Sequence, residues 1–295
     1  MLFKFINVLA LINLINSTQQ SSSSSTKKLP QAIIIGAKKC GTRALLKFIG
    51  AHPNVSAAGA EVHFFDRFYH MGTDWYKNQM PYSNQHQITI EKTPKYLIDA
   101  KAPERVHKMS PETKLIVVLR NPVVRAVSEY VQSQWRKRRN VKSTSNGTNS
   151  ANESKRFEQM LYDKDHSIKT NWAIVRNGLY YQYIQNWLEY FPLEQILFIN
   201  GEQLIKEPSV EIDKLQEFLN LSKLIKKEHF VRDTRKDFAC IIKPINTRQV
   251  KCLSDQKGRK HPDIDERILN DLYDYYRPHN KMLFDLMNQP AWWPI

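Results

Sequence analysis

The chain has 295 residues, with 44 lysines and arginines against 29 aspartates and glutamates, and three cysteines. This length is enough for a full hydrophobic core, and the cysteine count excludes a small disulfide-stapled fold. The net charge of +15 in an otherwise ordinary globular composition indicates a polyanionic partner. Nucleic acid, an acidic membrane and a sulfated glycan all satisfy that charge.

The N-terminus favours the secretory pathway. Residues 1–17 hold an early lysine and an apolar stretch of about 14 residues, which is short for a membrane span of about 20 but suits the core of a signal peptide. We predict a signal peptide or a short signal-anchor here, with an amphipathic first helix as the alternative. Residues 18–28 are Ser-rich and predict a flexible stem, so the folded domain is expected over 29–295.

Several Asn-x-Ser/Thr sequons support the secretory interpretation, although such triplets also arise by chance. Residues 140–155 have the composition of an exposed segment and are predicted to form a surface loop. The predicted glycosylation sites are Asn54, Asn146, Asn152 and Asn220, and a further sequon lies at Asn16.

Two of the cysteines lie in one polar, Pro-containing segment. In an oxidising compartment Cys240 and Cys252 could close a short loop, which would stabilise the fold by on the order of 3 kcal/mol. Two free thiols are the alternative, and Cys40 is left unpaired in either case. No second Cys/His pair stands at ligand spacing, so no metal site is expected.

The apolar runs predict a parallel sheet. AIIIG at 32–36 is continuous and ends in glycine, as in a strand that is buried on both faces. Strands and helices alternate along the chain, which predicts a single α/β domain with right-handed crossovers. Further strands are predicted at 87–91, 114–119 and 195–199; helices are predicted over 42–53 and from Pro122, Leu179 and Ser209; a late helical pair over 265–287 is interrupted at Pro278. The aromatic tail at 291–295 is expected to pack rather than to form an exposed patch.

The glycine loop, residues 36–43, resembles a phosphate-binding loop with its lysine displaced. In ATP- and GTP-binding loops a lysine follows the second glycine and a Ser/Thr follows the lysine, to reach the terminal phosphates and magnesium. Here Thr42 follows Gly41, and Lys39 stands two places before that glycine. A triphosphate is poorly served, whereas a 5′-phosphosulfate suits the loop; by spacing alone, a tight strand-to-helix turn is equally compatible.

The sequence LRNP marks a second ligand-binding position. Arg120 closes a buried strand, and Asn121-Pro122 combines a capping residue with proline at the first helical position. The C-terminal ends of strands are where open α/β sheets bind ligands. The alternative for Arg120 is a surface ion pair.

Seven motifs in order give a family resemblance. They are LPQAIIIGAKKCGTRAL, EVHFFD, EKTPKY, PERV, LRNP, NWL and KGRKHP. From Leu29 nearly to its C-terminus, the chain resembles the Golgi sulfotransferases that use 3′-phosphoadenosine 5′-phosphosulfate, most closely the heparan sulfate glucosamine 3-O-sulfotransferases. The resemblance implies a sulfotransferase fold with a P-loop-like parallel sheet, and a place in the Golgi lumen or among secreted proteins.

The resemblance also assigns the donor site. Lys39 matches the lysine on the phosphosulfate, and Arg120 and Ser128 match the pair that binds the 3′-phosphate. Cys40 is a departure, because the family usually has a small residue there; a cysteine could restrict the turn or be open to oxidation. The remaining donor-binding residues are Gly41, Thr42 and Arg43 of the glycine loop, and Lys257, Gly258, Arg259, Lys260 and His261 of a later loop.

The EVHFFD segment (residues 61–66) and the EKTPKY segment (residues 91–96) carry the implied chemistry. Glu61 matches the general base, since a sugar hydroxyl is a poor nucleophile until a carboxylate takes its proton. His63 and Asp66 are expected to orient Glu61 and the acceptor, and Lys39 and Lys92 to stabilise the departing phosphate in an in-line displacement at sulfur. Without the resemblance, these would be an ordinary surface carboxylate, a core histidine and an exposed lysine.

The acceptor implied by the resemblance is a heparan sulfate or heparin chain, with no nucleic acid partner and no metal required. Lys95 departs from the small residue of the family and could alter which sulfated sequence is preferred. Residues 135–139, WRKRR, could line a groove for the chain, although such a run is usually a solvated helix end. The predicted substrate-binding residues are Glu61, Val62, His63, Lys92, Thr93, Pro94, Lys95, Asn177, Gly178 and Gln182.

Three competing functions are weighed against this one. A nucleotide kinase would need Gly-Lys-Ser/Thr, which is absent. A secreted heparin-binding protein would explain the charge but not the donor-loop residues, and an inactive relative would keep the fold without catalysis. Within sulfotransferases, N-sulfation of glucosamine is the nearest rival. The resemblance also implies that Cys240 and Cys252 pair.

Overall fold

The computed structural model describes residues 25–140, 150–233, 238–253 and 261–295. Its centre is a five-stranded parallel sheet in the order β3, β5, β2, β6, β7. The predicted signal segment, most of the stem, and Asn16, Asn146, Lys257, Gly258, Arg259 and Lys260 lie outside the described residues. The strands are β2 (Ala32–Gly36), β3 (Val55–Ala57), β5 (Ile88–Lys92), β6 (Lys114–Leu119) and β7 (Ile196–Asn200).

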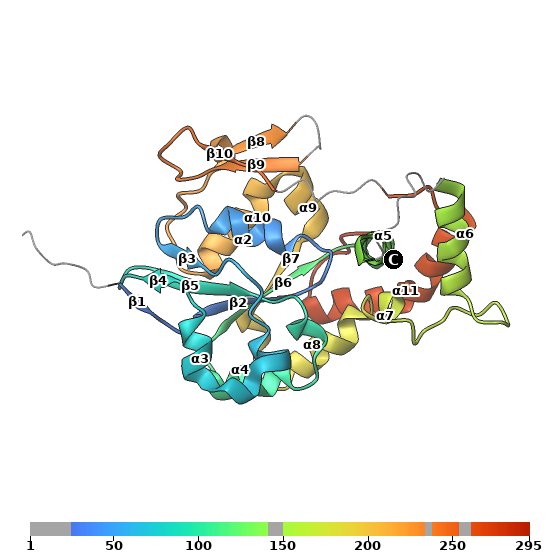
Figure 1. Ribbon diagram of the computed structural model, residues 1–295, viewed down its shortest axis with the longest axis horizontal. Helices are drawn as coiled ribbons and strands as arrows, with labels where there is room; N and C mark the ends of the chain where they lie inside the picture. Colours follow the sequence, from blue (N-terminus) through green and yellow to red (C-terminus); the bar gives the residue numbers. More distant parts are fainter. Residues whose placement is uncertain (1–24, 141–149, 234–237, 254–260) are drawn as a thin grey trace, which may run out of the picture.

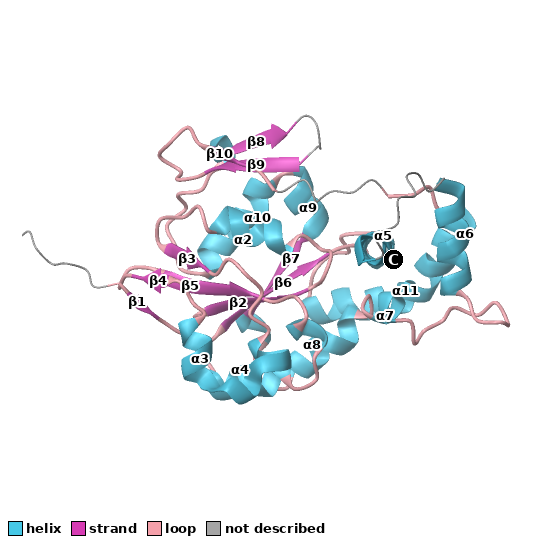
Figure 2. Ribbon diagram, viewed as in Figure 1, coloured by secondary structure: helices cyan, strands magenta, loops and turns pink. Residues whose placement is uncertain are grey.

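Helices cover both faces of this sheet, with α2, α9 and α10 on one face and α3, α4 and α8 on the other (Figures 1 and 2). The helices are α2 (Thr42–Ile49), α3 (Gly72–Asn78), α4 (Ala102–Met109), α5 (Pro122–Asn140), α6 (Ser150–Leu161), α7 (Ala173–Arg176), α8 (Tyr180–Leu188), α9 (Gly201–Lys206), α10 (Pro208–Phe218) and α11 (Glu266–Met287). In the part of the chain that the structure describes, no helix is both long and apolar enough to cross a membrane.

The α/β prediction is confirmed, and the four predicted strands are present as β2, β5, β6 and β7. Every residue of β2 is buried, which is why its sequence is an unbroken apolar run. Strand β3, at the edge of the sheet, was not predicted, because only Val55 of its three residues is buried. Short, half-exposed edge strands carry little hydrophobic pattern.

Two small antiparallel sheets flank the domain. One pairs β1 (Thr26–Lys27) with β4 (Tyr82–Ser83), and the other is ordered β10 (Val250–Lys251), β9 (Phe238–Ile242), β8 (Phe230–Asp233). The three-stranded sheet lies over α2 in Figure 1, where the rings of Phe230 and Phe48 meet edge to face with centroids 5.2 Å apart.

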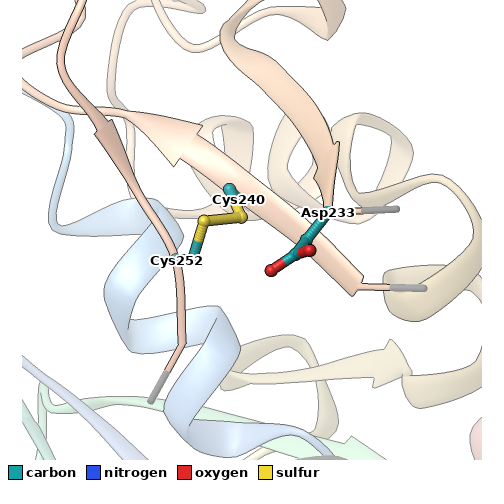
Figure 3. Close-up of side chains that lie close together, drawn as sticks. All are labelled: Asp233, Cys240 and Cys252. Atoms are coloured by element: carbon teal, nitrogen blue, oxygen red, sulfur yellow. A yellow bond between two sulfur atoms is a disulfide. The ribbon is translucent and has the colours of Figure 1, made fainter. Parts of the chain in front are cut away.

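A disulfide bond joins Cys240 of β9 to Cys252 just after β10 (Figure 3), which confirms the predicted pairing. The carboxylate of Asp233 lies beside it, and among the described residues these three side chains form the one group close enough to hold a metal ion. Because the two sulfurs are bonded to each other, they offer no thiolate ligand.

The predicted break at Pro278 is wrong, because α11 runs unbroken from Glu266 to Met287 with the proline inside it. Tyr276 and Asn280, on either side of the proline, are both buried. Packing of both halves offsets the roughly 3 kcal/mol that a mid-helix proline costs.

The predicted loop at 140–155 is also partly wrong, because α6 already begins at Ser150. Glu153 in its first turn is buried and accepts a hydrogen bond from Tyr130 Oη of α5 at 3.0 Å, and Arg138 of α5 forms an ion pair with it. These contacts dock the helix, although its composition is that of a loop. Residues 141–149 lie outside the described residues.

The aromatic tail packs against the domain, as predicted. Trp293 is buried, and its ring lies 4.8 Å from that of Phe284 in α11 and 6.4 Å from that of Tyr180 in α8. The tail therefore packs against both α8 and α11.

Candidate active site

The glycine loop joins the C-terminal end of β2 to α2 at the middle of the sheet (Figure 1). The N–H of Ala37 donates to Val118 O of β6 at 2.8 Å, and the N–H of Cys40 donates to Ala37 O at 3.2 Å. Lys39 and Gly41 have φ angles of 76° and 108°, a left-handed backbone that costs lysine more than glycine. With Lys39 half buried within it, the loop has the form of an anion-binding turn before a helix.

Cys40 faces the protein core rather than solvent. Its side chain is buried, with Sγ 3.5 Å from Tyr180 Oη, and that hydroxyl donates to Arg120 O at 2.8 Å. Burial raises the pKa of the Cys40 thiol to about 11. The expectation that this cysteine is open to oxidation is therefore wrong, because the thiol stays protonated and covered. Only its backbone contributes to the loop surface.

Arg120 follows β6 and is held by an unpredicted carboxylate. Its Nε lies 3.6 Å from Oε1 of Glu202, which also accepts the N–H of Asn121 at 2.9 Å. Glu202 lies just beyond β7, where burial raises its pKa. The ion pair considered for Arg120 is thus present, but its arginine side chain is only 21% exposed. The pair positions the guanidinium at the C-terminal end of β6.

The turn before α9 presses against the glycine loop. An added Cβ at Gly201 would lie 2.7 Å from Cys40 O and 2.8 Å from Leu119 O, closer than any side chain can approach. Asn200 caps α9 by accepting the N–H groups of residues 202 and 203. The backbone segments that follow β2, β6 and β7 are therefore in direct contact with one another.

His261 joins this cluster from the C-terminal part of the chain. Its pKa is lowered by burial and by the positive charges of Arg120 and Lys39. Positively charged residues from two distant segments, Lys39 and Arg120, therefore act on the His261 ring from a third. Donor binding by these residues stays a prediction. Arg43 is exposed at the start of α2, and Thr42 is buried beside it.

Ser128 lies half buried on α5, next to a chain of charged groups that sequence reasoning missed. Lys38 of the glycine loop donates to Glu129 at 2.5 Å, and Glu129 also pairs with the fully buried Arg125. Burial opposes ionisation of Glu129, but Arg125 and Lys38 outweigh it and lower its pKa. This chain ties the glycine loop to the helix that carries Ser128.

On the acceptor side, the structure brings together four of the five residues that the resemblance assigned to catalysis; the fifth, Lys39, lies in the glycine loop. Lys92, the last residue of β5, donates to Oε1 of Glu61 at 2.5 Å. His63 Nε2 lies 3.6 Å from the other Glu61 oxygen, and His63 Nδ1 lies 3.0 Å from Asp66. Glu61 is 42% exposed, whereas the Lys92 side chain is 2% exposed. The half-exposed carboxylate of Glu61 is thus paired with the buried ammonium group of Lys92.

Asp66 is the shared partner of two cations and an imidazole. Its buried carboxylate lies 3.6 Å from Arg67 Nε and 3.8 Å from Lys95 Nζ, in addition to its contact with His63. Lys95 is 47% exposed, so the departure from the family adds a cation at the surface of this site. Thr93 and Pro94 between the two lysines are buried, so the acceptor contact predicted for them is not supported by any exposed side-chain surface.

The remaining residues predicted to bind the acceptor lie on and before α8 and near the C-terminal end of α5. Asn177 is half buried and Gln182 is exposed, near the start of α8. Gly178 is buried, and a Cβ there would lie 2.7 Å from Tyr276 Oη, so this glycine serves close packing. Arg138 in the WRKRR run is engaged by α6, while residues 136 and 137 are exposed. Contact of these groups with an acceptor stays a prediction.

Two predicted glycosylation sites can be located. Asn220, at the end of α10, is exposed and has a left-handed backbone, and Asn54 is half buried before β3. Asn152 falls within the first turn of α6. Attachment of glycans stays a prediction.

Comparison with known proteins agrees with this arrangement. A family model described as the sulfotransferase domain matches residues 29–284. Over 274 residues the chain is 42% identical to heparan sulfate glucosamine 3-O-sulfotransferase 3B1 of Mus musculus, covering 92% of this chain and 67% of the relative. It is also 42% identical over 274 residues to heparan sulfate glucosamine 3-O-sulfotransferase 6 of Mus musculus, covering 92% and 76%. The chain belongs to the heparan sulfate glucosamine 3-O-sulfotransferase family.

The fold agrees with this family membership. A crystal structure of a sulfotransferase from Alicyclobacillus acidocaldarius superposes with a TM-score of 0.59 at 21% identity, covering 89% of this chain and 97% of that one. This likeness confirms the predicted sulfotransferase fold. The sequence-predicted resemblance to the 3-O-sulfotransferases is likewise confirmed by the relatives.

Sequence reasoning missed the residues that support the site rather than those that face it. Glu202 had a detectable signal, because it follows the C-terminal end of a predicted strand beside the strand that Arg120 ends. The pairing of Lys38 with Glu129 had none, because nothing in the spacing of residues 91 positions apart indicates contact.

Proposed function

We propose that this 3-O-sulfotransferase family member transfers a sulfuryl group from 3′-phosphoadenosine 5′-phosphosulfate to the 3-hydroxyl of glucosamine residues in heparan sulfate. The observation that carries the proposal is the contact of Lys92 with Glu61, beside His63 and Asp66. Lys92 ends β5, which pairs with β2, the strand that leads into the glycine loop. A base for a sugar hydroxyl and an anion-binding loop therefore share one edge of the sheet.

The donor would bind with its two anionic groups in different places. We assign the phosphosulfate to Lys39 and the glycine loop, and the 3′-phosphate to Arg120 and Ser128. The surroundings of His261 support this assignment, because the positive charges of both Lys39 and Arg120 lower the pKa of its imidazole. Lys257, Gly258, Arg259 and Lys260 would complete the donor site, as the resemblance implies.

The reaction is an in-line displacement at sulfur. Glu61 takes the proton of the glucosamine 3-hydroxyl while that oxygen forms a bond to sulfur. The bond between sulfur and the bridging phosphate oxygen breaks, and 3′-phosphoadenosine 5′-phosphate leaves with the electron pair. Lys39 and Lys92 stabilise the charge that develops on the departing oxygen. No step in this scheme uses a metal ion.

The acceptor surface matches a polyanion. The exposed side chains of Arg67 and Lys95 lie beside Asp66, which contacts His63 next to the half-exposed Glu61, and Arg43 is exposed at the start of α2. The net charge of +15 supports the same conclusion, and binding should weaken steeply as salt rises. The disulfide and the sequons support folding in an oxidising compartment, so we place the protein in the Golgi lumen or among secreted proteins.

The decisive experiment compares the protein from residue 25 onward with its Glu61→Gln variant. Transfer of labelled sulfate from the donor to heparan sulfate is measured, followed by disaccharide mapping. We expect label on the glucosamine 3-oxygen for the original sequence. The variant should lose about 10²- to 10⁴-fold in turnover while keeping its affinity for the donor product, because only the base is removed.

Each other outcome contradicts a different part of the proposal. Label on nitrogen or on another hydroxyl would overturn the acceptor assignment and keep the donor site. Full turnover in the variant would remove Glu61 from the mechanism. Donor binding without any transfer by the original sequence would indicate an inactive relative that only binds the glycan.

A further inference from the structure

The EKTPKY segment binds the backbone of the EVHFFD segment at three successive residues. The N–H of Val62 donates to Oε1 of Glu91 at 3.4 Å, and the N–H of His63 donates to Oγ1 of Thr93 at 3.3 Å. The N–H of Phe64 donates to the hydroxyl oxygen of Tyr96 at 2.8 Å. Each acceptor is a side chain, so backbone pairing of strands does not account for this ladder.

The three accepting side chains are buried and linked to one another. Glu91, Thr93 and Tyr96 are each fully buried. Thr93 Oγ1 donates to Glu91, and Tyr76 Oη donates to the other Glu91 oxygen at 3.3 Å. Groups held in a dry, close-packed interior have few alternative positions, so the ladder fixes the backbone that it binds.

The intervening lysines hold the side chains of the same segment. Lys92 binds Glu61, and Lys95 lies 3.8 Å from Asp66. Residues 91–96 thus have two kinds of contact with the EVHFFD segment. The buried side chains of Glu91, Thr93 and Tyr96 accept its backbone N–H groups, and the two lysines contact its carboxylates. His63 is thereby held at its main chain by Thr93 and at its ring by Asp66. Glu61 is held at its side chain by Lys92, and the next residue, Val62, is bound through its N–H.

We propose that Glu91, Thr93 and Tyr96 are positioning residues, which set the place of the Glu61 carboxylate and the His63 ring without touching either substrate. The inference rests on the proposed function of Glu61 as the base. A base that is displaced by about 1 Å can lose on the order of 100-fold in rate, because proton transfer depends on the distance between donor and acceptor. The backbone of residues 62–64 is where such a displacement would start.

The test uses rung variants, each of which removes one of the three hydrogen bonds to the backbone of residues 62–64 and keeps the shape of the side chain. Thr93→Val and Tyr96→Phe each remove a hydroxyl that accepts a backbone N–H, and Thr93→Ser keeps that hydroxyl. Matched controls are Thr113→Val and Tyr130→Phe, which are buried residues of the same types away from this ladder. Sulfate transfer, acceptor KM, donor-product affinity and thermal unfolding are measured for all five.

We expect Thr93→Val and Tyr96→Phe to lower kcat on the order of tenfold or more, with acceptor KM and donor-product affinity within about twofold of the original. Thr93→Ser should restore most of kcat. Hydrogen exchange at the amides of residues 62–64 should quicken in the two rung variants only. Tyr130→Phe removes the hydrogen bond to Glu153 and should shift unfolding to a similar degree, whereas Thr113→Val removes a buried hydroxyl that has no hydrogen-bond partner among the described residues and should shift it less. Both controls should keep kcat.

Two results would overturn the inference. One is an unchanged kcat in Thr93→Val and Tyr96→Phe while Glu61→Gln is inactive, which would leave the proposed function intact. The other is an equal loss of kcat in the controls, which would show that the rungs act only through global stability. Absence of transfer by the original sequence would instead contradict the proposed function.

Discussion

On the donor side, the glycine loop is held mainly by main-chain contacts, with Lys38 as its side-chain link to Glu129, whereas on the acceptor side the EVHFFD segment is held by side chains. Gly201 brings the turn after β7 against Cys40 O and Leu119 O, and Ala37 N–H bonds to Val118 O. On the acceptor side, Lys92 binds Glu61, and Asp66 is shared by His63, Arg67 and Lys95.

The difference corresponds to the ligands that the two sides are proposed to bind. A donor with fixed phosphate positions suits a loop whose geometry is determined mainly by backbone contacts. A glycan chain of varied sulfation suits a surface of side chains, because one substitution there changes charge without moving the fold. We therefore expect donor-side changes to act through shape and acceptor-side changes through charge.

The largest effect is expected from Gly201→Ala, which tests the donor side. Its Cβ would overlap two carbonyl oxygens, so either the glycine loop or the end of β6 must move. We expect donor-product affinity to fall on the order of 100-fold and stability to fall by about 1–3 kcal/mol. Isothermal titration with 3′-phosphoadenosine 5′-phosphate and urea denaturation measure the two effects.

Gly59→Ala is the matched control, because an added Cβ there meets no atom within 4 Å. It should leave donor-product affinity unchanged. Equal affinity in both variants would contradict the view that close backbone approach shapes the donor side.

The next effect concerns pH and the buried Glu91. Burial raises the pKa of Glu91 to about 7, against the opposing hydrogen bonds of Thr93 and Val62 and the charge of Lys92. The folded protein therefore holds this proton at pH values where the unfolded chain, with a pKa near 4.5, has released it. Stability must then fall as pH rises from 4.5 to about 7, by on the order of 2–3 kcal/mol in all.

Urea denaturation of the original sequence and of Glu91→Gln at pH 5 and pH 8 measures this contribution. The difference between the two proteins isolates Glu91, since the titrations of all other groups cancel. Among the groups that face Glu91, Tyr76 and Tyr96 have pKa values raised above 10 and stay neutral in this range. A difference in stability that is the same at both pH values would contradict the raised pKa.

The smallest effect is expected from Lys95→Ser, which tests the acceptor side. Lys95 is half exposed at 3.8 Å from Asp66, and such pairs contribute little to stability. We expect acceptor KM for heparan sulfate to rise about two- to fivefold at low salt, with kcat and donor affinity unchanged.

Lys227→Ser is the control. Lys227 is on η5 (Lys227–His229), outside the site, where it is exposed and paired with Glu207. It should leave KM unchanged. Equal KM changes in the two variants would mean that only net charge matters, and the distinction between the two sides would then lose its acceptor half.

Much of the fold could be predicted because parallel strands leave a simple pattern. Strands β2 and β6 are buried on both faces, so their sequences are continuous apolar runs that end at the C-terminal edge of the sheet. That edge placed Lys39 and Arg120 correctly before any contact was known. Edge strand β3 and the sheet β8–β9–β10 escaped prediction, because short strands with exposed residues lack such a pattern.

The sequence by itself determined the parallel sheet, the displaced lysine of the glycine loop and the motifs that placed the chain in its family. All of these are local in the chain, where spacing and apolar pattern act directly. Only the tertiary structure decided that Cys40 faces the core, that α11 continues through Pro278, and that Glu91, Thr93 and Tyr96 bind the backbone of residues 62–64. Those outcomes depend on which distant segments meet, and the packing and hydrogen bonds formed there outweigh local preference.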